Sequence, residues 1–320
     1  SHLFRTASEL LAEGFALAGN VWRRGSQRWL PLYEAKMAGI FDHRAADVVI
    51  SATALIRQGQ PDSLSEDDHR DPARVPLPRS WVAESDVRAA LRRVNTGWLL
   101  GFRDVTSSTN ERTMLATALP VAAIANSEAL LVLPHDDLAP LLPSIFSAMV
   151  FDYTARFAVG GTHINFFIAK QLAVLAPSQL GERCGWSAGS AAMWLRPRVL
   201  ELAFTAWDMT GYSADLGWVG PPFRWDPIRR EVLRAELDAA FFHLYGIDRE
   251  DVDYIMDTFP IVRRKDEAAH DEYRTKRLIL ERYDALAECI ANGTEYQTVL
   301  DPSPAHPSLA HPESTRPDWA

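Results

Sequence analysis

The chain has 320 residues, of which 47% are hydrophobic and 10% are aromatic, so it is long enough for one or two domains with a sizeable core. Its formal net charge of -9 argues against a protein that wraps nucleic acid with a uniformly basic surface. No stretch approaches about 18 uncharged apolar residues and no charged leader precedes an early apolar run, so we expect neither a membrane span nor a signal peptide.

The cysteines bear on the redox compartment of the protein, and the first residues bear on whether the sequence is a fragment. Cys184 and Cys289 are too few and too far apart in sequence for a disulfide framework or a metal site, so a reducing cytoplasm is expected. The sequence begins with Ser1 and His2, where an initiator methionine is normal. We therefore expect a fragment of a longer parent that continues upstream.

The basic residues are concentrated in the first third of the chain. Residues 1–60 and residues 72–115 each carry seven Arg or Lys, against five and four acidic residues respectively. Between them, residues 61–71 hold five acids and one Arg. A local surplus of arginine suits forked contacts to phosphate and to guanine edges, although a genomic bias towards arginine codons explains the composition equally well.

Hydrophobic periodicity and turn residues predict several short elements before residue 95. They are a helix over 7–17, a turn over 20–28, strands over 30–40 and 48–55, and a helix over 85–94. Residues 58–78 are rich in Pro, Asp and Ser and predict a long loop. In a DNA-reading module such a loop would order when its ligand binds.

Glu34 and Lys36 lie in the first of these predicted strands. Their carboxylate-x-lysine spacing is typical of metal-dependent nucleases, in which the acid holds the metal and the lysine holds the attacking water. That chemistry needs an upstream aspartate as well, and the first Asp of this chain is Asp42. A metal-dependent nuclease therefore remains an alternative function.

The stretch over 97–119 is the segment around which the rest of the chain is organised. Two apolar runs flank a turn rich in Ser, Thr and Asn, which predicts a strand, a polar turn and a second strand. Five charged or amide residues would then share one corner, either as an internal ion-pair network or as a surface for an anionic ligand. They are Arg103, Asp104, Asn110, Glu111 and Arg112.

Beyond this stretch the predicted elements become mainly helical, with a candidate boundary near 178–189. We expect strands over 129–133, 164–168 and 172–175, and helices over 138–158, 191–208 with an interruption at Pro197, 226–245, 248–259 and 271–292. The 226–245 helix has the clearest signals, because Asp226 is a good cap, Pro227 suits the first position and Gly246 follows the end. The last twenty residues are rich in proline and predict a flexible tail.

Five separated blocks resemble the carboxy-terminal half of Eco57I-like adenine-specific DNA methyltransferases and restriction-modification enzymes. The central block combines Arg103-Asp104 with TNERT over 109–113. The others are PLYEAKM over 31–37 with FDHR over 41–44, NFFIAKQL over 165–172, RAELDA over 234–239 with HLYG over 243–246, and DTFP over 257–260 with YRTK over 273–276. The resemblance covers roughly residues 30–285.

This resemblance implies an α+β fold in which a mixed-sheet target-recognition domain precedes a mainly helical domain. The expected limits are 1–180 for the target-recognition domain, 181–300 for the helical domain and 301–320 for the tail. The parent would transfer a methyl group from S-adenosylmethionine to adenine N6, alone or together with DNA cleavage. The expected partners are double-stranded DNA and the catalytic part of the same parent chain, and no membrane.

The fragment itself is expected to hold no catalytic, cofactor-binding or metal-binding residue. Residues 220–223 imitate the Asn-Pro-Pro-Tyr loop of amino-methyltransferases, but Gly220 has no side-chain oxygen to accept the hydrogen of the target amino group. The residues that the resemblance suggests for DNA binding are Lys36, Arg103, Asn110, Arg112, Arg156, Asn165 and Lys170.

These residues divide into two expected roles. Arg103, Asn110 and Arg112 should hold the corner of the sheet or touch phosphate, and we favour an internal pairing of Arg112 with Asp104 or Glu111. Phosphate contacts are expected instead from Lys36, Arg156 and Lys170, because we expect fewer carboxylates in their surroundings. Besides the nuclease, a non-catalytic protein-interaction module remains an alternative function.

Overall fold

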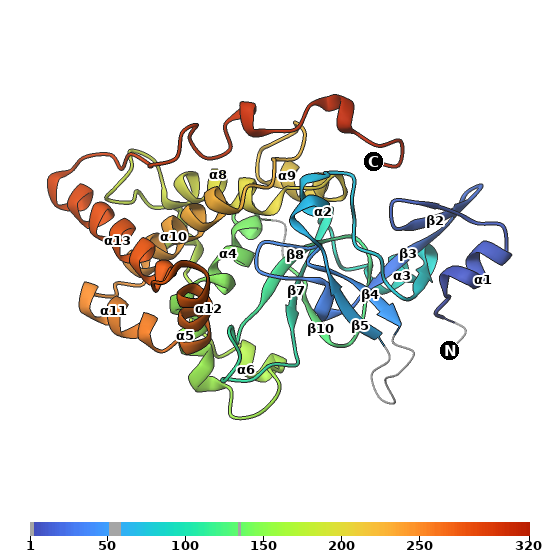
Figure 1. Ribbon diagram of the computed structural model, residues 1–320, viewed down its shortest axis with the longest axis horizontal. Coiled ribbons are helices and arrows are strands. Elements are labelled where there is room, and N and C mark those ends of the chain that lie inside the picture. The colour runs from blue at the N-terminus through green and yellow to red at the C-terminus, as the bar shows by residue number, and fades with distance from the viewer. Residues whose placement is uncertain (1–2, 51–58, 134–135) are drawn as a thin grey trace.

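The computed structural model describes residues 3–50, 59–133 and 136–320. Strands occur in the first 131 residues, whereas helices make up most of the chain from residue 139 onward (Figure 1). The expected α+β character is therefore confirmed. In the described ranges no helix is both long and apolar enough to cross a membrane.

The strands of these ranges form three sheets. The first has the order β1 (Ala16–Ala18), β2 (Val21–Arg24), β3 (Gln27–Tyr33) and β6 (Trp81–Ala83), all antiparallel, with β9 (Ala123–Ile124) added parallel to β3. The second places β7 (Trp98–Arg103) between β8 (Ala116–Pro120) and β10 (Glu128–Leu131), both antiparallel to it. The third is the hairpin of β4 (Ala46–Ile50) and β5 (Gly59–Ser63).

The helices of the first half are short, and those of the second half build a layer beside the sheets (Figure 1). Before β7 lie α1 (Ala7–Ala12), α2 (Glu66–Arg70) and α3 (Glu84–Ala90). After β10 follow α4 (Leu142–Ser147), α5 (Met149–Ala158), α6 (Phe166–Ala169), α7 (Pro177–Gly181), α8 (Ala191–Ala203), α9 (Thr210–Asp215), α10 (Pro227–Leu244), α11 (Arg249–Asp257), α12 (Pro260–His270) and α13 (Arg274–Asn292).

Elements with strong local signals form as predicted. The two strands of the 97–119 stretch are β7 and β8, paired antiparallel from Trp98 opposite Pro120 to Phe102 opposite Ala116. Helix α10 begins after Asp226, whose carboxylate accepts the backbone amides of Ile228 at 3.0 Å and Arg229 at 3.1 Å. Its end is followed by a glycine with a φ of 68°.

Several predicted boundaries are wrong because local geometry or a distant partner intervenes. The helix predicted over 7–17 ends at Ala12, since Gly14 has a φ of 81°. The described part of the predicted 58–78 loop contains β5, which pairs with β4, and α2, which Ser65 caps. Residues 51–55 of the predicted second strand lie outside the described residues.

The predictions over 138–175 also need correction. One long helix becomes α4 and α5, because Ala148 is extended with a ψ of 145° and frees the Met149 amide to bind Asp238 at 2.7 Å. The strand predicted over 164–168 is wrong, since Asn165 caps the short helix α6 there. No strand forms over 172–175 either, whereas α8 continues through Pro197 without the predicted interruption.

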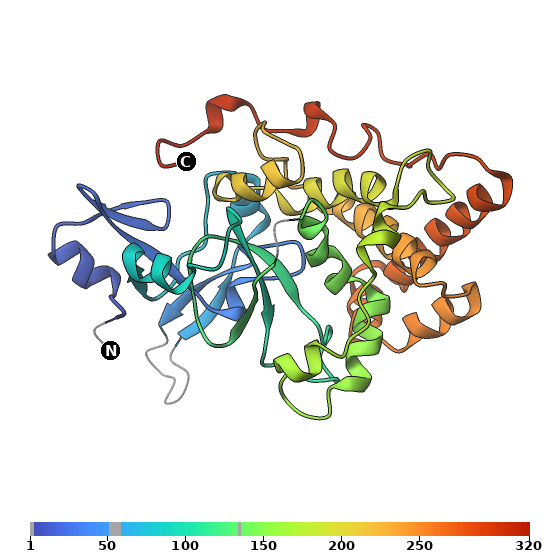
Figure 2. The ribbon, with the colours of Figure 1, turned by 180° about the vertical axis from the view of Figure 1, so that it is seen from behind.

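The largest hydrophobic core contains side chains from Phe41 to Ala310 and thus includes residues on both sides of position 180. The division into a target-recognition domain and a helical domain stays a prediction. Residues 301–320, the expected flexible tail, follow the surface to the β2–β3 hairpin (Figures 1 and 2), and their flexibility stays a prediction. There the Arg23 guanidinium donates to the carbonyl of Trp319 at 3.0 Å, and Ala310 pairs with Phe223 on the way.

Two buried arginines connect the first sheets to the helical layer. The guanidinium of Arg44 is 0% exposed and donates to backbone carbonyls, at 2.6 Å to His69 and at 2.9 Å to Thr205. Arg230 donates from α10 to the carbonyl of Phe41 at 3.0 Å and stacks on Trp225. Charge is tolerated here because carbonyl oxygens replace water as acceptors.

Replacement of Arg44 by lysine tests this connection. Five carbonyl oxygens accept from Arg44, and an ammonium has only three donors, so Arg44→Lys leaves buried acceptors unsatisfied. We expect the free energy of unfolding, measured in urea, to fall by about 3 kcal/mol. The matched control is Arg93→Lys on the surface, which should change stability by less than about 0.5 kcal/mol. Equal stability of the two variants would show that Arg44 does not hold the halves together.

Candidate nucleic-acid interface

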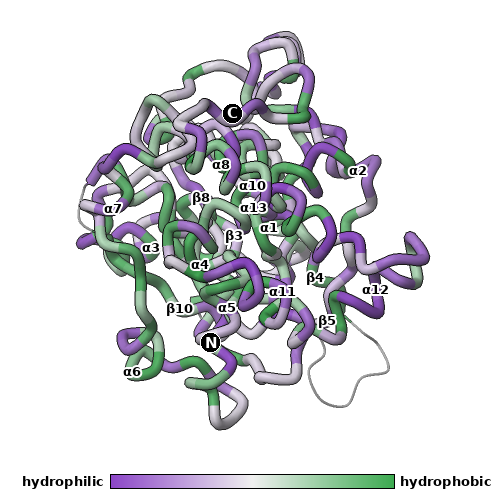
Figure 3. Tube along the Cα trace, turned by 90° about the vertical axis from the view of Figure 1, so that its left-hand side faces the viewer, coloured by the Kyte–Doolittle hydropathy of each residue, from purple (hydrophilic) through white to green (hydrophobic). Residues whose placement is uncertain are grey.

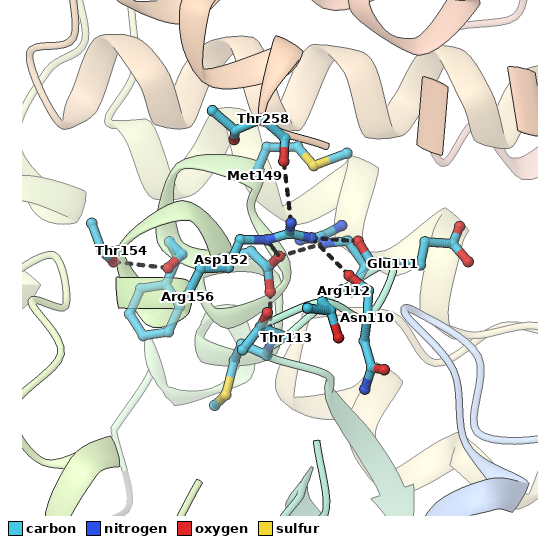
Figure 4. Close-up of polar contacts among 12 residues, drawn as sticks. Asn110, Glu111, Arg112, Thr113, Met149, Asp152, Thr154, Arg156 and Thr258 are labelled. Carbon is cyan, nitrogen blue, oxygen red and sulfur yellow. Dashed lines mark hydrogen bonds and ion pairs between the residues drawn. The ribbon is translucent and has the colours of Figure 1, made fainter. Parts of the chain in front are cut away.

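The turn between β7 and β8 is fixed by one buried carboxylate. Asp152, on α5, is fully buried, and its Oδ2 lies 3.2 Å from Nε of Arg156 and 3.4 Å from Nε of Arg112 (Figure 4). The backbone amide of Met114 donates to the other oxygen of this carboxylate. The two predicted arginines therefore meet at Asp152 and hold the turn against the helical layer.

Arg156 is occupied on every side. Its guanidinium donates to the carbonyls of Asn110 at 3.0 Å, Glu111 at 2.7 Å and Thr258 at 3.2 Å (Figure 4). It also lies over the ring of Phe259, 4.1 Å from the centroid. The expectation of few carboxylates near Arg156 is wrong, because Asp152 lies one helical turn earlier on α5 and points to the same side. Its donors are used inside the protein.

Arg112 is internally paired, as we favoured, but with a different partner. Neither Asp104 nor Glu111 binds it: Asp104 pairs with His163 at 3.2 Å, and Glu111 pairs with Lys265. The side chain of Arg112 points to the α4–α5 junction instead, where it contacts Asp152 of α5 and donates to the carbonyl of Ser147 at the end of α4. Asp104 and Glu111 are closer to Arg112 in sequence, but the turn after β7 packs against α5. Arg112 therefore pairs with Asp152 of that helix.

The remaining polar candidates lie around the same end of the sheet. Asn110 is exposed, and its Nδ2 lies 3.4 Å from Oγ1 of Thr106. Asn165 serves as the cap of α6, since its Oδ1 accepts the amide of Ile168 at 3.0 Å. Lys170 follows α6 and is exposed, with no side-chain partner in the part of the chain that the structure describes. It is the predicted cation that stays free for a ligand.

Lys36 and Arg103 line a common cleft of about 810 Å³. Arg79 is a third cation there, and Glu34 is the one carboxylate among the described lining residues. Glu34 lies 3.1 Å from Nζ of Lys36 and 2.8 Å from Nε of Arg79, so a single carboxylate serves both cations. The expectation of few acids near Lys36 is thus wrong, yet the cleft keeps a surplus of positive charge.

Arg103 contributes its charge to this cleft because the acid next to it, Glu128, is buried and does not neutralise it. Glu128 stands opposite Arg103 in the β7–β10 register and is 4% exposed. Its carboxylate oxygens have no hydrogen-bond partner within the described ranges, and it lies over Gly101, where a Cβ would come within 2.6 Å of Oε1. Burial raises the pKa of Glu128 to about 8, against the opposing effect of Arg103. Glu128 is therefore mostly protonated and neutral near pH 7.

Sequence reasoning missed both Arg79 and Glu128. Arg79 follows the segment predicted to be a long loop, and only the folded position of that segment brings it to Glu34. A signal for Glu128 was present, because it is a lone acid at the start of an apolar strand. Such an acid lies either at the solvent-exposed edge of a sheet or inside the protein with its carboxyl group protonated and neutral.

The geometry supports neither a metal-dependent nuclease site at Glu34 and Lys36 nor a base-stacking loop over residues 220–223. Over the described residues, no group of three His, Cys, Asp or Glu side chains is placed to hold a metal ion, and Glu34 is engaged by two cations. In the Gly-Pro-Pro-Phe segment, Phe223 is fully buried in the core and unavailable to stack on a base. Comparisons with family models, with curated proteins and with solved structures found no match for this chain.

Removal of Arg112 tests the role of the Asp152 cluster. Arg112→Ala leaves the buried carboxylate with one fewer cation and should lower the free energy of unfolding by about 3 kcal/mol. Arg183→Ala, at an exposed position, is the control and should have little effect. Urea unfolding monitored by circular dichroism measures the difference. An Arg112→Ala protein as stable as the control would contradict a structural role.

The protonation of Glu128 predicts how stability depends on pH. The folded protein holds a proton on Glu128 up to a pKa of about 8, whereas the unfolded chain loses it near 4.5, so this group makes stability fall as pH rises between these values. Glu128→Gln removes that contribution. Relative to wild type, the variant should gain stability from about pH 5 to about pH 9, by at most about 5 kcal/mol. Urea unfolding across this range checks it, with the exposed Glu250→Gln as control; a constant difference would contradict a raised pKa.

Proposed function

We propose that the chain is the sequence-specific DNA-recognition part of an adenine-N6 DNA methyltransferase or restriction-modification enzyme. The cleft lined by Lys36, Arg79 and Arg103 carries this proposal, because it gathers three cations and one carboxylate in a chain of net charge -9. Duplex DNA is a polyanion whose phosphates attract such local surpluses of positive charge. The order of the five sequence blocks supports the same assignment.

Binding in this cleft would combine two kinds of contact. Arg79, whose side chain is 42% exposed, and the neighbouring Lys36 would contact phosphate while Glu34 keeps both side chains oriented. Asn126 and Ser127 line the same cleft and offer amide and hydroxyl groups of the kind that read base edges. Phosphate contacts set the position on the duplex, and these polar groups supply selectivity.

The catalytic steps belong to the proposed parent. S-adenosylmethionine would bind to the upstream part of the same chain, in a cytoplasmic setting, and the present fragment would deliver the DNA. A side-chain oxygen at the target amino group is required for methyl transfer, and Gly220 offers none. The nuclease alternative has less support than DNA recognition, because Glu34 is the one described carboxylate in the cleft and is already paired.

Titration of a fluorescent duplex with the protein tests this function. Affinity should fall steeply with added salt, because each neutralised phosphate releases counterions. Arg79→Ala should weaken binding several-fold for every duplex sequence and reduce the slope of log affinity against log salt by about 1. Arg93→Ala, another exposed arginine away from the cleft lining, is the matched control. Absence of binding, or an affinity that salt does not change, would contradict DNA recognition.

A further inference from the structure

The segment from the end of α5 to the end of α6 forms a protruding corner of the molecule. It comprises residues 157–170, and it projects at the lower edge in Figures 1 and 2. Figure 3 places α6 at the same lower edge, with hydrophobic colouring in the helix. The corner is in contact with the cleft, because Val105 lines the cleft and forms a β-bridge with His163 of the corner.

This corner is held in place by backbone and ring contacts with the end of β7. The amide of Ile164 donates to the carbonyl of Asp104 at 2.9 Å, and the amide of Thr106 donates to the carbonyl of Thr162 at 3.0 Å. The ring of Phe166 meets the buried ring of Phe102 edge-on, with centroids 5.8 Å apart. The side chains of the corner therefore project from a backbone that is fixed relative to the cleft.

Two phenylalanine rings project from this anchored corner. Phe157 is 75% exposed and Phe167 is 74% exposed. A single exposed apolar side chain needs no explanation, since much of any protein surface is apolar. The neighbour Phe166 is 48% exposed and meets Phe102 with one ring edge, whereas Phe167, the next residue of the same short helix, has no ring contact of this kind in the described ranges.

The charge around the rings is also unusual for this acidic chain. No Asp or Glu occurs over residues 153–181, although the whole sequence has 42 acidic residues. Lys170, exposed and without a partner in the described ranges, lies three residues after Phe167. The one acid that pairs with this segment in the described ranges is Asp104, 3.2 Å from His163. Exposed rings and an exposed cation on a segment that carries no acid of its own are complementary to stacked bases between phosphates.

We propose that Phe167 inserts into a base step of duplex DNA bound in the cleft, with Lys170 on the adjacent phosphate. The proposal rests on the DNA-binding function proposed above and adds the way in which the duplex is deformed. An apolar wedge that partly unstacks one step kinks the duplex and lets it follow both the cleft and the corner. Sequences whose steps unstack easily would then bind better without direct base contacts.

A duplex carrying the fluorescent base 2-aminopurine reports unstacking directly. Wild-type protein should increase its fluorescence on binding, and Phe167→Ala should abolish the increase and weaken affinity about tenfold without changing the salt slope. Lys170→Ala should lower the salt slope and keep the fluorescence increase. Ile228→Ala, at a 68% exposed apolar position at the start of α10, is the control and should behave as wild type.

The outcomes separate the wedge from the function on which it rests. If wild-type protein binds duplex DNA and Phe167→Ala binds with the same affinity and fluorescence, the wedge is refuted and DNA recognition stands. If wild-type protein binds no duplex, both are refuted. Binding of wild-type protein to phosphatidylglycerol vesicles that Phe167→Ala abolishes, with DNA binding unchanged, would assign the corner to a lipid surface and overturn the proposal. Melting curves of all variants exclude unfolding as the cause of any loss.

Discussion

The arrangement of the proposed binding surface depends on the buried carboxylate of Asp152. It holds two guanidinium groups and one backbone amide, and these three donors come from the turn after β7 and from α5. The turn that most resembles a DNA-enzyme signature is thereby used to join the sheet to the helices. The chemistry open to a ligand lies beside this joint, in the cleft on one side and at the α5–α6 corner on the other.

A chain of net negative charge can bind a polyanion only if positive charge is concentrated and left uncompensated. Two features achieve this in the cleft. Glu34 orients Lys36 and Arg79 but can neutralise only one of them, and the burial of Glu128 keeps that acid neutral next to Arg103. Local geometry, and not composition, therefore decides where phosphate would be attracted.

Sequence reasoning succeeded where the determinants are local. Asp226, Pro227 and Gly246 set the limits of α10, and the turn residues after β7 set a hairpin, because caps and turns act over a few residues. It failed where the partner lies on another element, as when Arg112 pairs with Asp152 and when the break at Ala148 depends on Asp238. It also missed the pairing of Arg156 with Asp152, although the two are four residues apart on α5. Lys36 and Arg103 were predicted and line one cleft, whereas Arg79 in that cleft and the buried Glu128 opposite Arg103 were missed.

The two buried arginines also bear on the order in which the chain folds. Arg44 reaches the Thr205 carbonyl over 161 residues, and Arg230 reaches that of Phe41 over 189 residues. Contacts this remote form late, since the loop between them must first be closed. Arg44 also donates to carbonyls of residues 68–74, so part of its hydration shell is lost within the first half. We expect the remaining water on both guanidinium groups to be given up in a final docking step, when sheets and helices are both assembled. Such a late desolvation couples the two halves kinetically, so neither is expected to reach its native packing far ahead of the other.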